Sequence, residues 1–152
     1  MLIDLRSIPP HGLTARGEEA PSIIDIQDPG AEFYRPIQYD LDISLAGNIL
    51  LVRGRLTTVV RFTCSRCLKK FEAPLEIKDF QVQREVTDRG ETIDLTDDIR
   101  TDIILAVSVK PLCQPECRGI CPSCGQDLNQ GSCDCSVERS VSPFAELDKI
   151  KF

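Results

Sequence analysis

Six of the eight cysteines in this chain lie in one short segment, which begins at Cys113 and ends at Cys135. The other two, Cys64 and Cys67, form a CxxC motif far upstream. Prolines and glycines interrupt the segment, and it carries too few bulky apolar residues to build a core of its own. Some force other than burial of apolar surface must therefore order it. Because eight thiols make two sets of four, and a structural zinc ion takes four ligands in a tetrahedron, we expect two structural Zn²⁺ ions to supply that force.

The spacing of the cysteines predicts which four sulfurs meet at each ion. Cys64-x-x-Cys67 lies between two predicted strands, so a tight turn would point both sulfurs at one centre and form half of a site. A helix that stops before Pro111 would have to deliver the next pair beside this turn. We expect site one to consist of Cys64, Cys67, Cys113 and Cys117, and site two of Cys121, Cys124, Cys133 and Cys135. Since only three residues separate Cys117 from Cys121, these two could exchange sites.

Three other uses of the thiols fit the sequence less well. Disulfides belong to oxidising compartments, and the N-terminal residues lack the basic and apolar regions of a secretion signal, so we expect a reducing cytoplasm. Cys117-x-x-x-Cys121-x-x-Cys124 has the spacing of the radical-SAM iron–sulfur motif, but the chain is too short for the α/β barrel of those enzymes. Thiol redox chemistry at Cys64 and Cys67 would be favoured by nearby cations, yet no βαβ pattern surrounds them.

Composition limits the remaining possibilities. At 152 residues, 41% hydrophobic and 28% charged, the chain fits a globular protein with one real core. No apolar run approaches the ~18 residues that suggest a membrane span. The net charge of −6 repels polyanions as a whole, so contact with a nucleic acid would need a local basic patch.

Hydrophobic periodicity predicts three long antiparallel strands. Apolar residues alternate with polar ones from Ile37 to Leu45, and Gly47-Asn48 supplies a tight turn. A second run occupies even positions from Leu50 to Phe62. A third occupies odd positions from Phe71 to Ile77 and then changes phase, which predicts a β-bulge near Lys78-Asp79. The three runs predict an antiparallel β meander.

Shorter elements flank this meander. We expect strands at Leu2–Leu5 and Ser22–Ile26 within an otherwise loop-like region that ends at Tyr34. Thr96 followed by two aspartates predicts the start of a helix that continues to about Val109. Ser142-Pro143 predicts a short terminal helix, with Phe144, Leu147 and Ile150 on one face.

The expected fold class is therefore α+β and mainly β. It comprises an antiparallel meander with one packed helix over residues 1–110, then a Cys-rich zinc-binding segment and a short terminal helix over residues 111–152, packed as one domain.

The sequence favours a binding protein over an enzyme. Four thiolates saturate a zinc ion and leave no position for an activated water, and no catalytic His/Asp/Ser set or phosphate-binding glycine loop is present. We therefore expect no small-molecule substrate. Arg61, Arg66, Lys69 and Lys70 surround the CxxC motif and give a local charge of +4. They could contact phosphates of RNA, or could simply offset the −2 charge of a zinc–tetrathiolate centre, and the sequence leaves both open.

Several motifs resemble those of the large ribosomal RNA subunit accumulation protein family (YceD-like), formerly a domain of unknown function. They are Cys64-Ser-Arg-Cys67-Leu, the run from Pro111 through Cys124-Gly-Gln-Asp-Leu-Asn, Cys133-Asp-Cys135 and Pro143-Phe-Ala-Glu-Leu. The resemblance spans roughly Ile37 to the C-terminus and supplies no catalytic residues. It implies a non-catalytic, cytoplasmic ribosome biogenesis factor that supports accumulation or processing of 23S rRNA. Its partner would be the precursor large subunit, through rRNA or a basic ribosomal protein. The alternative from another class is a cytoplasmic thiol-redox or metal-handling protein.

Overall fold

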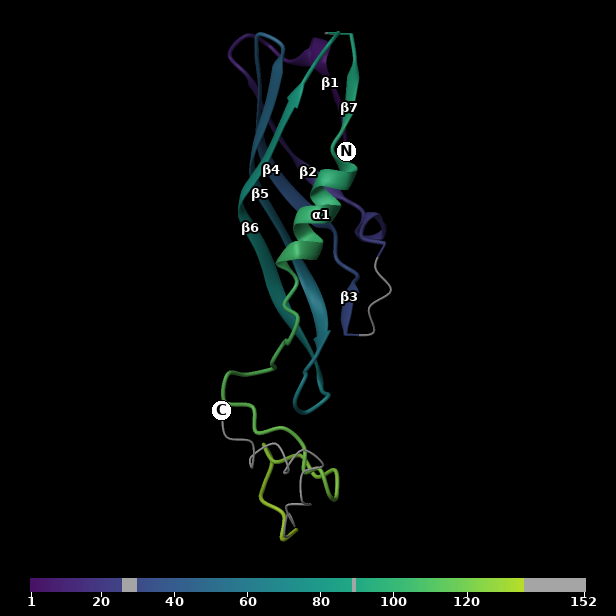
Figure 1. Cartoon of the computed structure of the whole chain (residues 1–152), viewed down its shortest axis with the longest axis vertical. Helices are drawn as coiled ribbons and strands as arrows, with labels where there is room; N and C mark the ends of the chain where they lie inside the picture. The colour runs from purple at the N-terminus through teal and green to yellow at the C-terminus, as the bar shows by residue number, and fades with distance from the viewer. Residues whose placement is uncertain (26–29, 89, 136–152) are drawn as a thin grey trace, which may run out of the picture.

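The computed structural model describes residues 1–25, 30–88 and 90–135. Its strands are β1 (Leu2–Asp4), β2 (Leu13–Glu19), β3 (Ala31–Phe33), β4 (Ile37–Ala46), β5 (Ile49–Thr63), β6 (Lys70–Glu85) and β7 (Thr92–Asp94). One α-helix, α1 (Thr96–Ala106), and two 3-10 turns, η1 (Leu5–Ser7) and η2 (Pro21–Ile23), complete the described elements. The molecule is elongated, with β1 and β7 near one end and the Cys-rich segment (residues 111–135) at the other (Figure 1).

The long sheet is an antiparallel meander in which β4, β5 and β6 pair in chain order. A turn at Gly47-Asn48 joins the first two strands, and residues 64–69 join β5 to β6. β2 pairs with the outer edge of β4, while β3 pairs with β5 beyond the point where β4 begins. The mainly β, antiparallel fold class with one helix and a Cys-rich end is thus confirmed.

The predicted β-bulge is present and explains a glycine in the middle of a strand. Gly54 pairs with Phe80 and Leu56 with Ile77, so Arg55 lies opposite the two residues Lys78 and Asp79. At this bulge β4 and β5 approach closely. A Cβ on Gly54 would lie 2.1 Å from the carbonyl oxygen of Asp40, a distance that no side chain tolerates. The change of phase in β6 and the glycine in β5 therefore have one structural cause.

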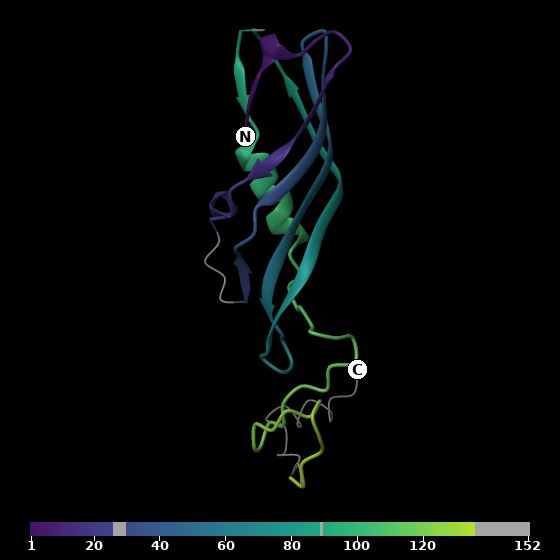
Figure 2. The ribbon, with the colours of Figure 1, turned by 180° about the vertical axis from the view of Figure 1, so that it is seen from behind.

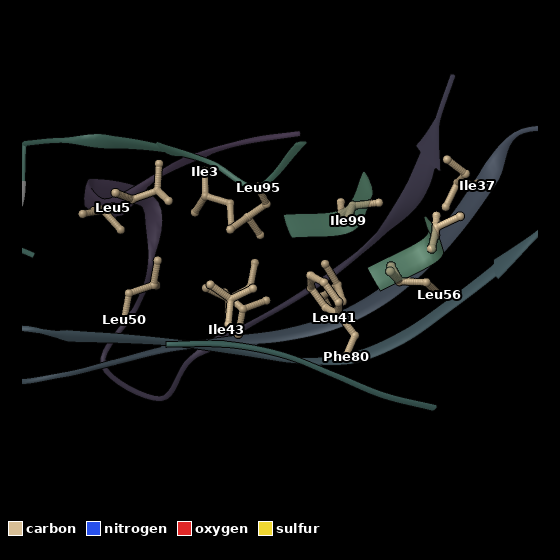
Figure 3. Packing of buried hydrophobic residues seen from close by; sticks show 14 of the residues in the cluster. Ile3, Leu5, Ile37, Leu41, Ile43, Leu50, Leu56, Phe80, Leu95 and Ile99 are labelled. Atoms are coloured by element: carbon tan, nitrogen blue, oxygen red, sulfur yellow. The ribbon is translucent and has the colours of Figure 1, made fainter. Parts of the chain in front are cut away.

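The core lies between one face of the sheet and a layer formed by α1, β1 and β7. In Figure 3, Ile3, Leu5, Leu95 and Ile99 lie over a row of sheet residues, which are Leu50, Ile43, Leu41, Phe80 and Leu56. Seen from behind, the helix crosses behind the strands and the opposite sheet face is uncovered (Figure 2). That face carries cross-strand charge pairs such as Arg16–Asp40, with a nitrogen–oxygen distance of 3.0 Å. The sheet is therefore half-buried, as alternating strands require.

Ion pairs and hydrogen bonds fix the helix on this core. Ile99 and Ile103 are fully buried beneath it. The Arg84 guanidinium of β6 donates to both carboxylate oxygens of Asp98, at 2.7 and 3.0 Å. Arg100 donates to the carbonyl of Ile23 in η2 at 2.6 Å. The end of α1, and hence the start of the Cys-rich segment, is placed by these contacts.

The short elements differ in part from the predictions. Ser22 and Ile23 form a 3-10 turn rather than the predicted strand, since Pro21 begins a tight turn there, and Ile26 lies outside the described residues. The predicted N-terminal strand is present but ends one residue early, at Asp4, and Ile3 and Leu5 are both buried as expected. The strands β2, β3 and β7 were not predicted.

The helix is also shorter than predicted, because it ends at Ala106 instead of Val109. Val107 adopts an extended conformation and packs against Ala31, Val60 and Phe62, an apolar cluster between the sheet and the tip of the β5–β6 hairpin. Thr96 is the first helical residue and not the cap. The Asp94 carboxylate instead accepts from the Thr96 amide and hydroxyl, at 2.9 and 2.6 Å. The predicted terminal helix at Ser142–Ile150 lies outside the described residues.

Candidate metal centres

The turn between β5 and β6 has the hydrogen bonds of a metal-binding knuckle. The amide of Cys64 donates to the carbonyl of Lys69 at 2.8 Å, and the amide of Leu68 donates back to the carbonyl of Cys64 at 3.0 Å. Leu68 has a φ of 60°, in the left-handed region that residues with a side chain seldom adopt. This sharp reversal turns Cys64 and Cys67 toward the same side of the tip.

The same arrangement recurs around the second CxxC motif. The amide of Cys121 donates to the carbonyl of Gln126 at 2.8 Å, and the amide of Gly125 donates to the carbonyl of Cys121 at 2.9 Å. Gly125 occupies the position of Leu68 and has a φ of 74°. The two knuckles are therefore alike in backbone, but only the second has the glycine that the conformation favours.

The first group of sulfurs joins the hairpin tip to the Cys-rich segment. The sulfurs of Cys64, Cys67, Cys113 and Cys117 all lie within 4.8 Å of one another. Cys64 and Cys117 are 3.7 Å apart, and Cys67 and Cys113 are 3.6 Å apart. A tetrahedral Zn²⁺ with bonds of about 2.3 Å to sulfur spaces its ligands about 3.8 Å apart. The donor set therefore fits zinc, whereas disulfide sulfurs are bonded at about 2.0 Å.

Three hydrogen bonds hold the Cys-rich segment against the hairpin tip. The Ser65 amide donates to the carbonyl of Pro111, two residues before Cys113, at 2.9 Å. Arg66 reaches across to donate its guanidinium to the carbonyl of Cys117 at 2.8 Å. In the opposite direction, the amide of Ile120 donates to the carbonyl of Arg66 at 3.2 Å. The hairpin tip and the start of the Cys-rich segment, which are widely separated in sequence, thus lie together around the first group of sulfurs.

The second group lies entirely within the Cys-rich segment. The sulfurs of Cys121, Cys124, Cys133 and Cys135 also lie within 4.8 Å of one another. This is the partition that the sequence analysis expected. Cys121 is buried, but Cys124 and Cys135 are exposed, whereas three of the four cysteines in the first group are buried. The second group is therefore the more accessible to solvent, chelators and oxidants.

Amides and neighbouring thiols shift the pKa values of the first group in opposite directions. Burial raises the pKa of Cys64, but the amides of Cys113, Cys67 and Arg66 outweigh it and lower the pKa to about 6. Burial and the thiols of Cys67 and Cys117 raise the pKa of Cys113 to about 12. The Cys64 thiol thus ionises easily, while the Cys113 thiol ionises with difficulty because a second negative charge would lie beside the first.

The second group behaves in the same way. The amides of Cys124 and Ser123 lower the pKa of Cys121 to about 6. The neighbouring Cys124 thiol and burial raise the pKa of Cys135 to about 12. Four thiolates at this spacing repel one another, so full ionisation requires a positive charge among them. A divalent cation would supply that charge.

The predicted basic cluster is partly neutralised by acids from other strands. Arg61 donates to Glu32 and to Glu72, each at 3.2 Å, and its guanidinium carbon lies 4.3 Å from the centre of the Tyr34 ring. These contacts occupy both ends of the guanidinium on the open face of the sheet. Arg61 therefore fixes β3, β5 and β6 together. Sequence reasoning did not anticipate this, because Glu32 lies on a strand that was not predicted and Glu72 faces Arg61 only through the register of the hairpin.

The other three predicted contact residues lie at the tip. The Lys69 ammonium forms an ion pair with Asp127 at 2.5 Å, and Arg66 is bonded to the Cys117 carbonyl. Lys70 is exposed. Within the described residues, Arg66, Lys70 and also Arg118, which the sequence analysis missed, make no ion pair and are exposed. The uncompensated positive charge is thus smaller than predicted and extends toward Arg118.

Sequence reasoning also missed two residues between the cysteines of the second group. Asp127 pairs with Lys69, and that ammonium together with the Asn129 amide lowers the pKa of Asp127 to about 2. Asn129 directs its side-chain NH₂ at the Cys117 sulfur, 3.5 Å away. The signals for them in the sequence were polar residues in a short loop between metal ligands and their place in the run Cys124-Gly-Gln-Asp-Leu-Asn.

The C-terminal part of the chain resembles a known protein family. Residues 78–151 match the family described as "Large ribosomal RNA subunit accumulation protein YceD". The C-terminal part of the chain is thus similar to this family. The matched part contains α1 and six of the eight cysteines, while Cys64, Cys67 and the predicted basic cluster precede it.

The curated relatives of this chain are distant and longer. An uncharacterised protein of Mycobacterium leprae is 26% identical over an aligned length of 135 residues, and the alignment covers 78% of this chain and 62% of the relative. An uncharacterised protein of Mycobacterium tuberculosis is 28% identical over an aligned length of 106 residues, and the alignment covers 60% of this chain and 51% of the relative. The chain therefore spans about half to three fifths of the length of these relatives.

A plant relative carries a functional name. The chloroplastic "Large ribosomal RNA subunit accumulation protein YCED homolog 1" of Arabidopsis thaliana is 30% identical over 59 residues, which are 39% of this chain and 18% of that protein. The search of solved structures found no significant match. Within the described ranges, no helix has the length and apolar character needed to cross a membrane.

Proposed function

We propose that this chain is a non-catalytic, cytoplasmic ribosome biogenesis factor that supports accumulation of 23S rRNA and assembly of the large subunit. The observation that carries the proposal is the match of residues 78–151 to the YceD family, together with the name of the plant relative. The proposed partner is the precursor large subunit, contacted through rRNA or a basic ribosomal protein.

Two structural Zn²⁺ ions are part of this proposal. Cys64, Cys67, Cys113 and Cys117 would hold one, and Cys121, Cys124, Cys133 and Cys135 the other. Zinc in such a set of four thiolates cross-links the chain and leaves no coordination position for a substrate or an activated water. This supports a binding role for the end of the molecule that carries both sets, hereafter the metal end (residues 64–70 and 111–135).

We propose that the metal end contacts the precursor particle through its uncompensated cations. Lys70 and Arg118 are exposed and lack ion pairs within the described residues, so they can meet phosphate without losing an internal partner. Arg61 and Lys69 hold internal ion pairs and serve the fold first. The overall charge of −6 restricts any RNA contact to this end.

Gradient sedimentation of cell extract tests the proposal. The protein is expected to comigrate with large-subunit precursors at low salt, and a strain that lacks it should accumulate less 23S rRNA relative to 16S rRNA. Lys70→Glu combined with Arg118→Glu should remove the comigration. The matched control is Arg53→Glu with Lys78→Glu, two exposed cations of the sheet, and it should comigrate normally. Comigration that survives the first pair of changes would move the contact to the acidic surface, and normal 23S rRNA without the protein would refute the proposed function.

The second candidate, a thiol-redox or metal-handling protein, is favoured by one observation. Cys124 and Cys135 are exposed, so the second group could exchange its ion or its protons with solvent. Alkylation followed by mass spectrometry separates the two functions. Rapid modification of these thiols in freshly isolated, reduced protein would favour redox or metal handling, while resistance until a chelator is added would favour structural zinc.

A further inference from the structure

The loop that closes the second metal centre lies against the first. Residues 125–132 connect Cys124 to Cys133, and a short loop of this kind needs only to return the chain to its own metal. Instead, Asn129 donates from Nδ2 to the Cys117 sulfur of the first group at 3.5 Å. A ligand of one centre is therefore contacted by a residue whose position depends on the other.

Asn129 is held in this orientation by bonds at both ends of its side chain. Its Nδ2 also donates to the Asp127 carboxylate at 2.7 Å. Its Oδ1 accepts from the Arg118 amide at 2.8 Å and from Gln114 Nε2 at 3.3 Å. Because Oδ1 is occupied by two donors, the NH₂ group is the end that faces the sulfur. Such a donor stabilises the thiolate that a metal ion requires.

Asp127 forms a second connection between the centres. Its carboxylate is only 16% exposed and pairs at 2.5 Å with Lys69, which directly follows the first knuckle. Its other oxygen accepts from the amide of Asn129 at 2.9 Å. The loop of the second centre is thereby attached to the hairpin tip that carries Cys64 and Cys67.

The backbone continues the same contact. The amide of Leu128 donates to the carbonyl of Gly119 at 2.9 Å, and Gly119 lies so close to Arg66 that a Cβ there would be 3.1 Å from the Arg66 carbonyl. Ile120 and Asp127 form an isolated β-bridge. Residues 119–120 are therefore enclosed between the hairpin tip and the loop of the second centre.

We propose that the two metal centres are thermodynamically coupled through Asp127 and Asn129, with Asn129 acting as a positioning residue for the Cys117 thiolate. Metal bound by Cys121, Cys124, Cys133 and Cys135 fixes the loop, and the fixed loop presents its donor and its carboxylate to the first centre. Filling the second centre then raises the affinity of the first, and the effect is reciprocal. This inference rests on the proposed metal sites but concerns their order and dependence.

Titration of the full chain, reduced and stripped of metal, tests the coupling. Co²⁺ is the probe, since its visible absorption in a tetrahedral thiolate site reports occupancy directly, and Zn²⁺ competition gives the affinities. With Cys124→Ser and Cys135→Ser, which disable the second centre, the first centre should bind about 10- to 100-fold more weakly than in the parent.

Loop variants identify the residues that carry the coupling. Asn129→Ala should weaken the first centre about tenfold or more. In chains whose first centre is disabled by Cys64→Ser and Cys67→Ser, adding Asn129→Ala should leave the affinity of the second centre unchanged, because no coupling remains to be lost. Asp127→Asn retains an oxygen for Asn129 and removes the charge opposite Lys69, so it should give a smaller loss. Gln130→Ala is the matched control, because Gln130 is an exposed neighbour in the same loop.

The possible outcomes are distinct. Two ions that bind independently, with the first centre unchanged by the serine pair and by Asn129→Ala, would overturn the coupling and leave the metal sites in place. A chain that binds no Co²⁺ or Zn²⁺ at either group would overturn the proposed metal sites themselves.

Discussion

Leu68 stands at the one non-glycine position with positive φ among the described residues, in the knuckle that carries Cys64 and Cys67. A side chain in this conformation costs roughly 1–2 kcal/mol, and Leu68 is 62% exposed, so burial recovers little of it. Leu68→Gly should therefore retain metal binding with an equal or higher melting temperature. Leu68→Ile should lower both the melting temperature and the metal affinity, because a β-branched side chain crowds the backbone further. Calorimetry and zinc competition provide the measurements, and equal effects of the two changes would contradict this account.

Gly54 is a second residue whose identity the fold requires. An added methyl group would meet the Asp40 carbonyl and the Leu41 backbone, at 2.1 and 2.8 Å, and both belong to a central strand that cannot move aside freely. Gly54→Ala should lower the free energy of unfolding by roughly 1–3 kcal/mol. Urea denaturation measures the loss. Gly131→Ala is the control, because the nearest atom to its added Cβ is 3.8 Å away. Similar unfolding midpoints for the two variants would show that the strands at the bulge can separate.

At the scale of elements, the start of α1 depends on an acid that precedes it. The bonds from the Thr96 hydroxyl and amide lower the pKa of Asp94, so its contribution to stability is present above the ordinary pKa near 3.8 and is lost as the pH falls through the lower value of the folded state. Asp94→Ala should reduce the free energy of unfolding by about 1 kcal/mol at pH 7. The difference between parent and variant should shrink below about pH 4, with Glu91→Gln as a control. A difference that persists at low pH would exclude the carboxylate as its source.

The strands that the sequence predicted are those with one face buried in the core and the other exposed to solvent. β4, β5 and β6 alternate between core and solvent, so their periodicity was visible, and even the bulge appeared as a change of phase. β2 has no such alternation, because its side chains are exposed or only half-buried along its whole length, and pairing with β4 is what makes it a strand. β3 and β7 have three residues each and exist through their partners β5 and β1.

The candidate site likewise has a part that was predictable from the sequence and a part that was not. Ligand spacing in the sequence predicted the two sets of four cysteines whose sulfurs lie together, although it left Cys117 and Cys121 free to exchange. The ion pairs of Arg61 with Glu32 and Glu72, and of Lys69 with Asp127, join residues brought together only by strand register and by the docking of the Cys-rich segment. The charge of the basic cluster could not be estimated without them.

For the whole molecule, metal is expected to hold the Cys-rich segment to the sheet. Structural zinc in small peptides contributes roughly 10–16 kcal/mol of apparent binding free energy, comparable with the roughly 5–15 kcal/mol that stabilises an entire domain. Chelation of the reduced protein should therefore increase amide hydrogen exchange in residues 111–135 and at the hairpin tip, while the core strands around Val52 remain protected. Protein kept in excess zinc is the control. Unchanged exchange after chelation would mean that the segment is ordered without metal.

The β5–β6 hairpin also sets a length. β5 has 15 residues, and at about 3.3 Å per residue it spans about 50 Å between the turn at Gly47-Asn48 and Cys64. Side chains alternate between the two faces of the sheet, so the hairpin can change length without disturbing the core only in steps of two residues per strand. Removing two paired residues from each strand would shorten it by about 7 Å and keep every side chain on its original face. Removing one residue from each strand would turn the side chains beyond the deletion, including those of the tip, to the opposite face. A partner bound at the tip is thus held at a fixed distance from the core that α1 covers.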